Sequence, residues 1–183
     1  WSFTADFKSL FASDNLANNP EVIFHRTYDD ALAIRHSVSS YSNGTELQPR
    51  SANLDLLSAF ICADGKTWQH SDLENASNFR LQNLVHTRDP RFEATFMDTV
   101  NTPAVGTLVY THKFSGREAL SYIGGTYPAK WMGNTNVNDA PIVRLAEVVL
   151  NWVEAKAILA EQFGADAVTQ ADLDKSINAI RSR

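Results

Sequence analysis

The run of residues from Arg144 to Ala157 constrains the fold more than any other part of the chain. It reads RLAEVVLNWVEAKA, and its apolar residues fall on most sides of an α-helix. The polar residues at positions i, i+3, i+7 and i+10 share one face and are Arg144, Glu147, Asn151 and Glu154. A mostly apolar helix is usually buried, and a buried charged group needs a partner. The pattern therefore predicts a packed scaffold helix with a buried, paired polar row.

Glu147 and Glu154 do not have the spacing of a catalytic carboxylate pair. They are seven residues apart on one helix, which displaces their backbones by about 10 Å along the axis. The carboxyl groups of a glycosidase face each other across the substrate at about 5 to 9.5 Å. Structural ion pairs are the better interpretation, and three arginines are candidate partners: Arg144, Arg181 and Arg183.

Charge and length argue against two classes of protein. The 183 residues carry a net charge of −5 and contain no block of Lys and Arg, so nucleic-acid binding is not predicted. No apolar run approaches the roughly 20 residues that span a bilayer. The 44% hydrophobic content is that of a globular domain. The single cysteine, Cys62, excludes an internal disulfide, and its neighbours Phe60 and Ile61 predict a buried structural thiol.

Local patterns predict a mainly helical protein with short β-hairpins and long irregular loops. Helices are predicted over residues 2–11, 51–62, 80–87, 90–97 and 141–163, with another starting at Thr169. β-rich runs occur at 21–28 and 107–114, which pair with each other or form separate hairpins. Clusters of Gly, Asn, Pro and Ser predict loops over 36–50 and 124–141.

The last two predicted helices form a hairpin. Gly164 is a natural terminator of the first helix, and Thr169 with Asp172 resembles a capping box at the start of the second. A single hairpin does not make a repeat array, because several units are needed to bury a shared core. The chain shows no internal period of about 34 residues.

No metal or cofactor site is predicted. The five histidines lack the i, i+4 spacing of a zinc site on a helix. Oxygen-bearing residues alternate at Asn134, Asn136, Asn138 and Asp139, but the acidic start and distal Glu of a calcium loop are missing. A solvated loop is therefore the better interpretation. P-loop, nucleophile-elbow and dinucleotide motifs are also absent.

Five motifs follow one another along the chain. They are NPEVIF at 19–24, F-x-x-x-D-G-K at 60–66, RDPR at 88–91, RLAEVVLNWVEA at 144–155 and INAIRSR at 177–183. In this order they resemble landmarks of the SusD/RagB family, the glycan-binding outer-membrane lipoproteins of Bacteroidetes. Each motif is short, but together they extend over nearly the whole chain.

The resemblance implies a fold, a location and a partner. The chain would be one SusD/RagB-like C-terminal region, residues 1–183, truncated at both ends. Its C-terminal hairpin would be the last of several tetratricopeptide-like helix pairs. The protein would be held on the cell surface at the outer membrane by a lipid anchor that this chain lacks. It would bind oligosaccharides without catalysis and deliver them to a SusC-like TonB-dependent transporter.

Aromatic residues in predicted loops are the candidate glycan-binding groups. Sugar rings present apolar C–H faces that stack on aromatic planes, while nearby polar side chains hydrogen-bond the hydroxyls. Trp68 follows the Asp64–Gly65 turn, and the Gly-rich loop carries the others, so the predicted set is Trp68, Tyr127, Trp131, Asn134 and Asn136. The alternative interpretation is that these aromatic residues anchor long loops to the core.

Two other classes of function stay open. The helix hairpin is compatible with a helical-repeat module that binds proteins, which a screen of peptides or partner proteins would detect. A glycoside hydrolase is disfavoured by the carboxylate spacing, and release of reducing ends from a bound glycan would detect it. The sequence does not name the glycan, because no residue code links loop aromatics to a particular sugar.

Overall fold

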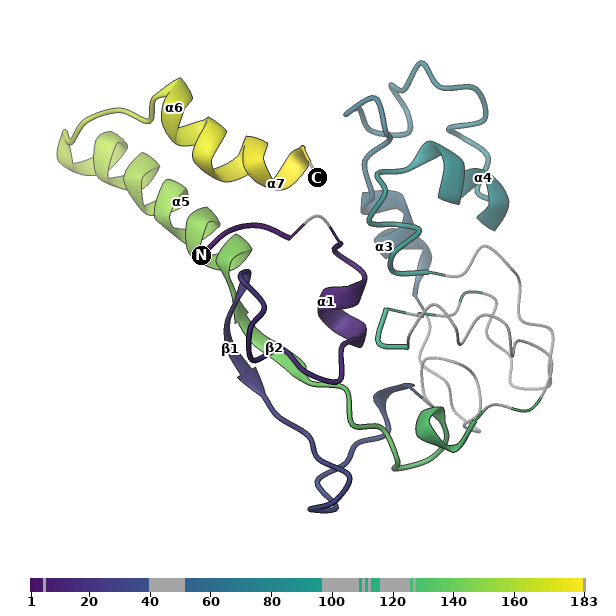
Figure 1. Cartoon of the computed structure of the whole chain (residues 1–183). Coiled ribbons are helices and arrows are strands. Elements are labelled where there is room, and N and C mark those ends of the chain that lie inside the picture. The colour runs from purple at the N-terminus through teal and green to yellow at the C-terminus, as the bar shows by residue number, and fades with distance from the viewer. Residues whose placement is uncertain are drawn as a thin grey trace. The chain divides into compact units, whose positions relative to one another are not determined.

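The computed structural model describes residues 1–4, 6–39, 52–96, 109, 111, 113–115, 126 and 128–182. The chain divides into two compact units, and each unit is made of separate chain segments (Figure 1). Unit 1 comprises Trp1–Asp6, Asn15–Thr27 and Asp139–Arg183, and unit 2 comprises Phe7–Asp14 and Tyr28–Asn138. None of the described helices is long and apolar enough to cross a membrane.

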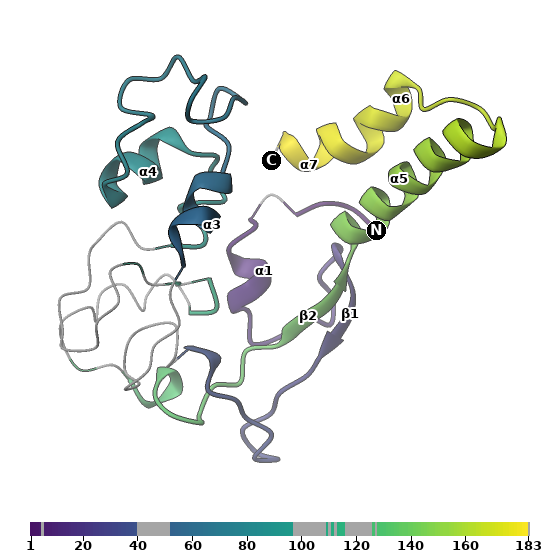
Figure 2. The same cartoon turned by 180° about the vertical axis from the view of Figure 1, so that it is seen from behind.

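Unit 1 contains a two-stranded antiparallel sheet (Figure 2). Strand β1 (Val22–Arg26) pairs with β2 (Ala140–Arg144), in a register that places Val22 opposite Arg144 and Arg26 opposite Ala140. The sequence predicted β1 but assigned 124–141 to a loop. Strand β1 pairs with β2, whose last residues the sequence had assigned to the start of the long helix. The run 107–114 lies partly outside the described residues. In that run Thr111 instead forms an isolated bridge with Phe96.

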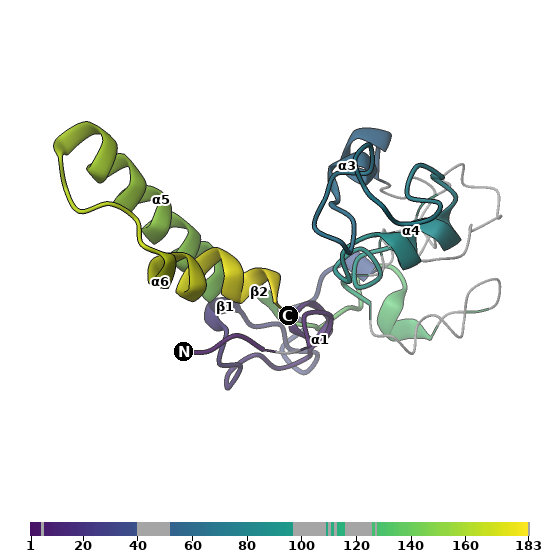
Figure 3. The ribbon, with the colours of Figure 1, turned by 90° about the horizontal axis from the view of Figure 1, so that it is seen from above.

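The long helix and its hairpin partner are present, although the helix begins at Leu145 rather than directly after Pro141. Helix α5 (Leu145–Phe163) directly follows β2 and ends at Gly164, which adopts a left-handed conformation with φ of 68°. The chain returns alongside α5 through α6 (Gln170–Leu173), the π-helical turn η3 (Asp174–Asn178) and α7 (Ala179–Arg181) (Figure 3). Both hydrogen bonds of the Thr169–Asp172 capping box are present.

The predicted burial of the polar row on α5 is wrong for most of its members. Glu147, Asn151 and Glu154 are exposed, and Arg144 is partly buried. Arg144 pairs with the fully buried Glu21, with its Nη1 3.4 Å from Oε1. The prediction failed because helical periodicity shows which residues are apolar, whereas burial also needs a neighbouring element to cover them.

Much of α5 is uncovered within the described residues. The side chains that it buries belong to Ala146 and Val153. Four larger apolar side chains at i, i+4, i+11 and i+15 are exposed: Val148, Trp152, Leu159 and Phe163. They form one stripe, which we call the α5 stripe, on the side of the helix next to the covered one.

Unit 2 is organised around aromatic and aliphatic side chains rather than long elements. Its helices include α1 (Ser9–Ala12), α3 (Leu54–Ala59), α4 (Leu81–Thr87) and the 3₁₀ turn η2 (Ala129–Trp131). The buried cluster joins α3 and α4 to the segment after them and contains Leu57, Leu81, Leu84, Phe92, Phe96 and Val109. The rings of Phe60, Phe92 and Phe96 meet with centroids 5.1 to 5.8 Å apart.

Three predicted helices are shorter than expected or missing. The helix predicted over 51–62 is shortened to α3, with Asn53 as its N-cap and Phe60 as its C-cap. The predicted helix over 2–11 is limited to α1, because Ser2 and Thr4 donate their backbone N–H groups to Pro20 and Glu21 instead. Residues after Pro90 form turns rather than the predicted helix over 90–97, whose last residue lies outside the described part. Helix α4 agrees with the prediction within one residue.

Arg88 is buried at the centre of unit 2 with only 2% of its surface exposed. Its Nη1 donates to Thr87 Oγ1 at 2.9 Å and to the sulfur of Cys62, and its Nη2 donates to the Ala76 carbonyl at 2.9 Å. The guanidinium also lies 5.2 Å from the centroid of the Phe79 ring. Within the described residues no carboxylate pairs with it. Cys62 is buried, as predicted.

Candidate ligand-binding site

Unit 2 contains a pocket of about 500 Å³. This volume is within the range of small-molecule sites in proteins, which is about 300 to 1,000 Å³. Its walls are mainly apolar and include Phe7, Leu56, Phe60 and Phe96. Three charged side chains also line it: Asp89, Arg91 and Lys113.

Backbone pairing on either side of Cys62 holds the pocket together. Asp89 donates its N–H to the Ile61 carbonyl at 2.9 Å, and Ala63 donates to Thr87 at 3.0 Å. This pairing brings the segment after α3, which carries Phe60, beside the segment after α4, which carries Arg91. The pocket is therefore built where two loop segments are tied together by main-chain hydrogen bonds.

Asp89 fixes the orientation of Arg91. The carboxylate of Asp89 is largely buried and accepts from Arg91 Nε at 2.6 Å, from Nη2, and from the Arg91 backbone N–H at 3.0 Å. This hydrogen bonding raises the pKa of the Arg91 guanidinium above its ordinary value, although partial burial opposes the shift. Arg91 Nη1 makes no hydrogen bond with any described residue, and the side chain is about a quarter exposed. Arg91 is thus a cation of fixed orientation that lines the pocket and has donors that no described residue uses.

Lys113 contributes a second cation to the pocket wall. Its Nζ lies 3.8 Å from the centroid of the Phe11 ring and 5.3 Å from that of Phe7. A cation over an aromatic face is attracted by the ring quadrupole. Phe7 therefore forms part of the apolar wall and also holds Lys113 at it.

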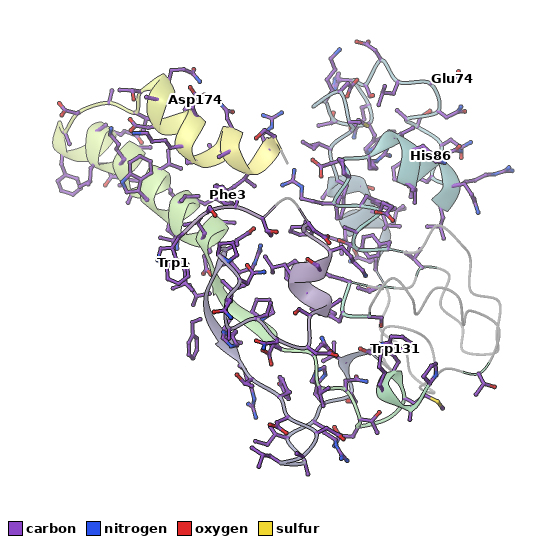
Figure 4. The ribbon with its side chains drawn as sticks, in the orientation of Figure 1. Trp1, Phe3, Glu74, His86, Trp131 and Asp174 are labelled. Carbon is purple, nitrogen blue, oxygen red and sulfur yellow. The ribbon has the colours of Figure 1, made fainter. Side chains whose placement is uncertain are left out.

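The aromatic loop residues predicted from the sequence differ in how deeply they are buried. Trp68 is half-buried and packs edge-on against Phe79, with ring centroids 5.2 Å apart. Trp131 is only 6% exposed, and Figure 4 shows its ring beside the η2 turn. Burial of the Trp131 ring favours the alternative interpretation, in which this residue anchors its loop. Tyr127 lies outside the described residues.

The two predicted asparagines also differ. Asn134 is exposed. Asn136 is 1% exposed, and its amide accepts from the Ser39 N–H at 2.8 Å and donates to the Lys130 carbonyl at 2.5 Å. The nearby cavity beside Trp131 has a volume of only about 20 Å³. The buried amide of Asn136 therefore stabilises the loop backbone.

Sequence reasoning did not select the pocket residues. The RDPR run at 88–91 was noted as a landmark, but its two arginines were not given separate roles. Asp89 and Arg91 are followed within a few residues by the aromatic residues Phe92 and Phe96. An acid and a base two residues apart, beside aromatics after a helix, are the signal that was available. Among all residues that the structure describes, no group of three or more His, Cys, Asp or Glu side chains is placed to hold a metal ion.

Comparison with known proteins gives one match. Residues 98–183, somewhat less than half of the chain, match the sequence model of the SusD family. The resemblance is thus confirmed for the C-terminal portion, which carries α5 and its motif. The family is one of glycan-binding surface proteins that are generally non-catalytic. No curated protein and no solved structure gives a match to this chain.

Proposed function

We propose that this protein is a SusD-like component of a glycan-uptake system. It binds oligosaccharides at the cell surface and passes them, without breaking a bond, to a SusC-like TonB-dependent transporter. A lipid anchor would hold it at the outer membrane. The observation that carries the proposal is the match of residues 98–183 to the SusD family.

The pocket in unit 2 supplies the chemistry that glycan binding requires. Phe7 and Phe60 are partly exposed and offer aromatic surface to the C–H face of a sugar ring. Arg91 offers donors to hydroxyl or carboxyl oxygens, and Asp89 holds it in place. A mostly apolar pocket with a few convergent polar groups is the usual form of a small-molecule site.

The charged groups of the pocket support binding rather than hydrolysis. Glycoside hydrolysis generally uses two carboxyl groups that flank the scissile bond. Among the described residues lining the pocket, the only carboxylate is Asp89, and Arg91 hydrogen-bonds both of its oxygens. The described lining of the pocket therefore offers no second carboxyl group for hydrolysis of this kind.

The loop residues predicted from the sequence extend this proposal. Trp68 is the best placed of the three aromatic residues, because its ring is partly exposed whereas Trp131 is buried. Trp68→Ala in the intact protein should weaken glycan binding several-fold if the ring stacks on a sugar, since aromatic anchors typically contribute more than 1 kcal/mol. Trp131→Ala should act mainly through loop stability. Tyr127, Asn134 and Asn136 complete the proposed loop set.

A protein-interaction module is the second candidate function. The α5 stripe exposes four large apolar side chains along one side of a 19-residue helix. Amphipathic helices bind grooves and other helices through residues at this spacing. A module of this kind would bind peptides or proteins and no oligosaccharide.

A glycan array with the intact protein tests the proposal directly. The expected result is retention of a defined class of oligosaccharide, with micromolar to millimolar affinity in calorimetry and no release of reducing ends. Failure to bind any glycan would remove the proposed function. Steady release of reducing ends from a bound glycan would replace it with a hydrolase.

A further inference from the structure

We propose that the unit 2 pocket selects a sugar that carries a carboxylate, that is, a uronic acid residue of an acidic glycan. Arg91 is the residue that binds the carboxylate of this sugar. This inference rests on the proposed function, because it assumes that the ligand of the pocket is a sugar. It concerns the described pocket alone and makes no use of the loop set around Trp131.

The hydrogen bonds of Arg91 leave one edge of its guanidinium available. Asp89 occupies the Nε–Nη2 edge, with Nε donating to Oδ1 and Nη2 to Oδ2. The other edge, between Nη1 and the second hydrogen of Nη2, has no acceptor among the described residues. A guanidinium matches a carboxylate through two parallel N–H···O bonds. The available edge can therefore hold a second carboxylate in the same way that the first edge holds Asp89.

Asp89 favours this arrangement although it is itself negatively charged. The two edges share Nη2 but face different directions, so a ligand carboxylate on the second edge would contact the cation without displacing Asp89. The ion pair also fixes the orientation of Arg91, and less conformational entropy is then lost when a ligand binds. Lys113 lines the same pocket and adds a second positive charge. Because the site is partly removed from water, these charges act more strongly than on an open surface.

The apolar walls account for the sugar ring. The pocket places Phe7, Phe60 and Phe96 around the charged groups. A uronic acid has one relatively apolar face of C–H groups, and its carboxylate projects from the edge of the ring. A neutral hexose of the same shape would contact the same walls but would bring no charge to Arg91. The predicted preference for the acidic sugar is therefore the difference in binding free energy between a charged and a neutral partner of the Arg91 guanidinium.

Calorimetry with chemically matched probes measures that difference. The probes are trigalacturonate, its fully methyl-esterified form and neutral galactotriose, each titrated into the intact protein. Trigalacturonate should bind at least about tenfold more tightly than the ester, since a hydrogen bond to a charged group contributes more than one between neutral groups. Raising the ionic strength should weaken the binding of trigalacturonate and leave that of galactotriose nearly unchanged.

Arg91→Gln should abolish the preference for the acid over the ester. The matched control is Arg35→Gln, which removes an arginine from an exposed Arg–Asp pair with Asp30 and does not line the pocket. Arg35→Gln should keep the full preference. Lys113→Met keeps an unbranched side chain against the rings, removes the charge, and should reduce the preference in part. It also serves if Arg91→Gln fails to fold after losing the ion pair with Asp89.

The outcomes separate this inference from the proposed function. Equal affinity for trigalacturonate and its ester, or an unchanged preference in folded Arg91→Gln, would overturn the acidic-sugar inference and leave glycan binding intact. Binding of galactotriose alone would do the same. If no oligosaccharide binds in this experiment or on the glycan array, both proposals fall together.

Discussion

The two units of this protein are stabilised in different ways. Unit 1 relies on regular backbone hydrogen bonds, in the β1–β2 ladder and the 19-residue helix α5. Unit 2 has short helices joined by irregular segments, and a cluster of aromatic and aliphatic side chains forms its core. Regular elements satisfy their own backbone polar groups, whereas irregular segments need side chains or other partners to do so.

In unit 2, buried polar side chains hydrogen-bond the backbone groups of these irregular segments. Arg88 donates to the Ala76 carbonyl, and Asn138 Nδ2 donates to the Phe11 carbonyl at 3.3 Å. Asn136 bridges one N–H and one carbonyl of its neighbouring segments. In irregular segments of this kind, a polar residue is therefore more readily explained by hydrogen bonds to the loop backbone than by ligand binding.

The largest expected effect tests the core of unit 2. Phe92 is fully buried and contacts the rings of Phe60 and Phe96, so Phe92→Ala should lower the free energy of unfolding by about 3–5 kcal/mol. The matched control is Phe163→Ala at the end of α5, where the ring is 74% exposed. It should change that free energy by no more than about 0.5 kcal/mol. Urea denaturation measures both.

A large loss at Phe163 would break the comparison. It would mean that the α5 stripe is covered in the intact protein, because removing an exposed side chain leaves no cavity.

A smaller effect is expected when Arg88 is replaced by lysine. Lysine keeps the positive charge but cannot reach the Thr87 hydroxyl, the Cys62 sulfur and the Ala76 carbonyl with one planar group. Arg88→Lys should therefore lower the free energy of unfolding by about 1–3 kcal/mol. The exposed Arg35→Lys is the control and should have little effect. An equally small effect at both positions would show that the hydrogen bonds of Arg88 are dispensable.

Replacing a positive-φ glycine by alanine should cause the same small loss of stability in each unit. Gly133 in unit 2 and Gly164 in unit 1 have φ of 53° and 68°, and a Cβ added at either position would meet no atom within 4 Å. Alanine at each should cost about 1 kcal/mol, because the penalty comes from the left-handed backbone alone. Thermal unfolding of the two variants checks this. A clearly larger loss at one glycine would mean that its surroundings add a steric term.

The dependence of the unfolding free energy on pH should differ between the two units, although each contribution is small. In unit 2, His36 Nδ1 accepts from the Val38 N–H and Nε2 contacts the Asn138 carbonyl at 3.0 Å, which requires a neutral ring protonated on Nε2. Burial lowers the pKa of His36, although the Asn138 carbonyl opposes the shift. The neutral ring therefore stabilises the fold above a pH of about 6.5, and this contribution is lost as the pH falls. His36→Gln should flatten the unfolding free energy between about pH 7.5 and 5.

Asp172 provides the contrasting case in unit 1. Its hydrogen bonds with Lys156 first, and with Thr169 next, lower the pKa of its carboxyl group. The ionised acid stabilises the fold above about pH 4, and that contribution is lost only at lower pH. The difference between the protein and Asp172→Asn should thus be constant from pH 5 to 8 and shrink in stronger acid. A change of this difference near pH 6.5 would contradict the assignment.

Local sequence predicted the parts of unit 1 that depend on local interactions. The apolar period of α5, the glycine at its end and the Thr169–Asp172 box act within a few residues, so the sequence contains all that is needed to identify them. Strand β2 was missed although Ile142 and Val143 are β-branched. A five-residue strand gives little signal of its own until β1 pairs with it.

Tertiary structure alone decided what is buried and where a ligand fits. The exposure of Glu147 and Glu154 depends on which side of α5 has a neighbour, and periodicity does not carry that information. Likewise, the pocket joins Phe7, Phe60 and Arg91 from three distant chain segments. The proximity of Phe60 and Arg91 follows from the long-range pairing of Cys62 with Arg88, so no spacing rule in the sequence contains it. The sequence by itself determined the long helix, its C-terminal end at Gly164 and the family resemblance, and only the fold brought the Asp89–Arg91 pair to an aromatic-walled pocket.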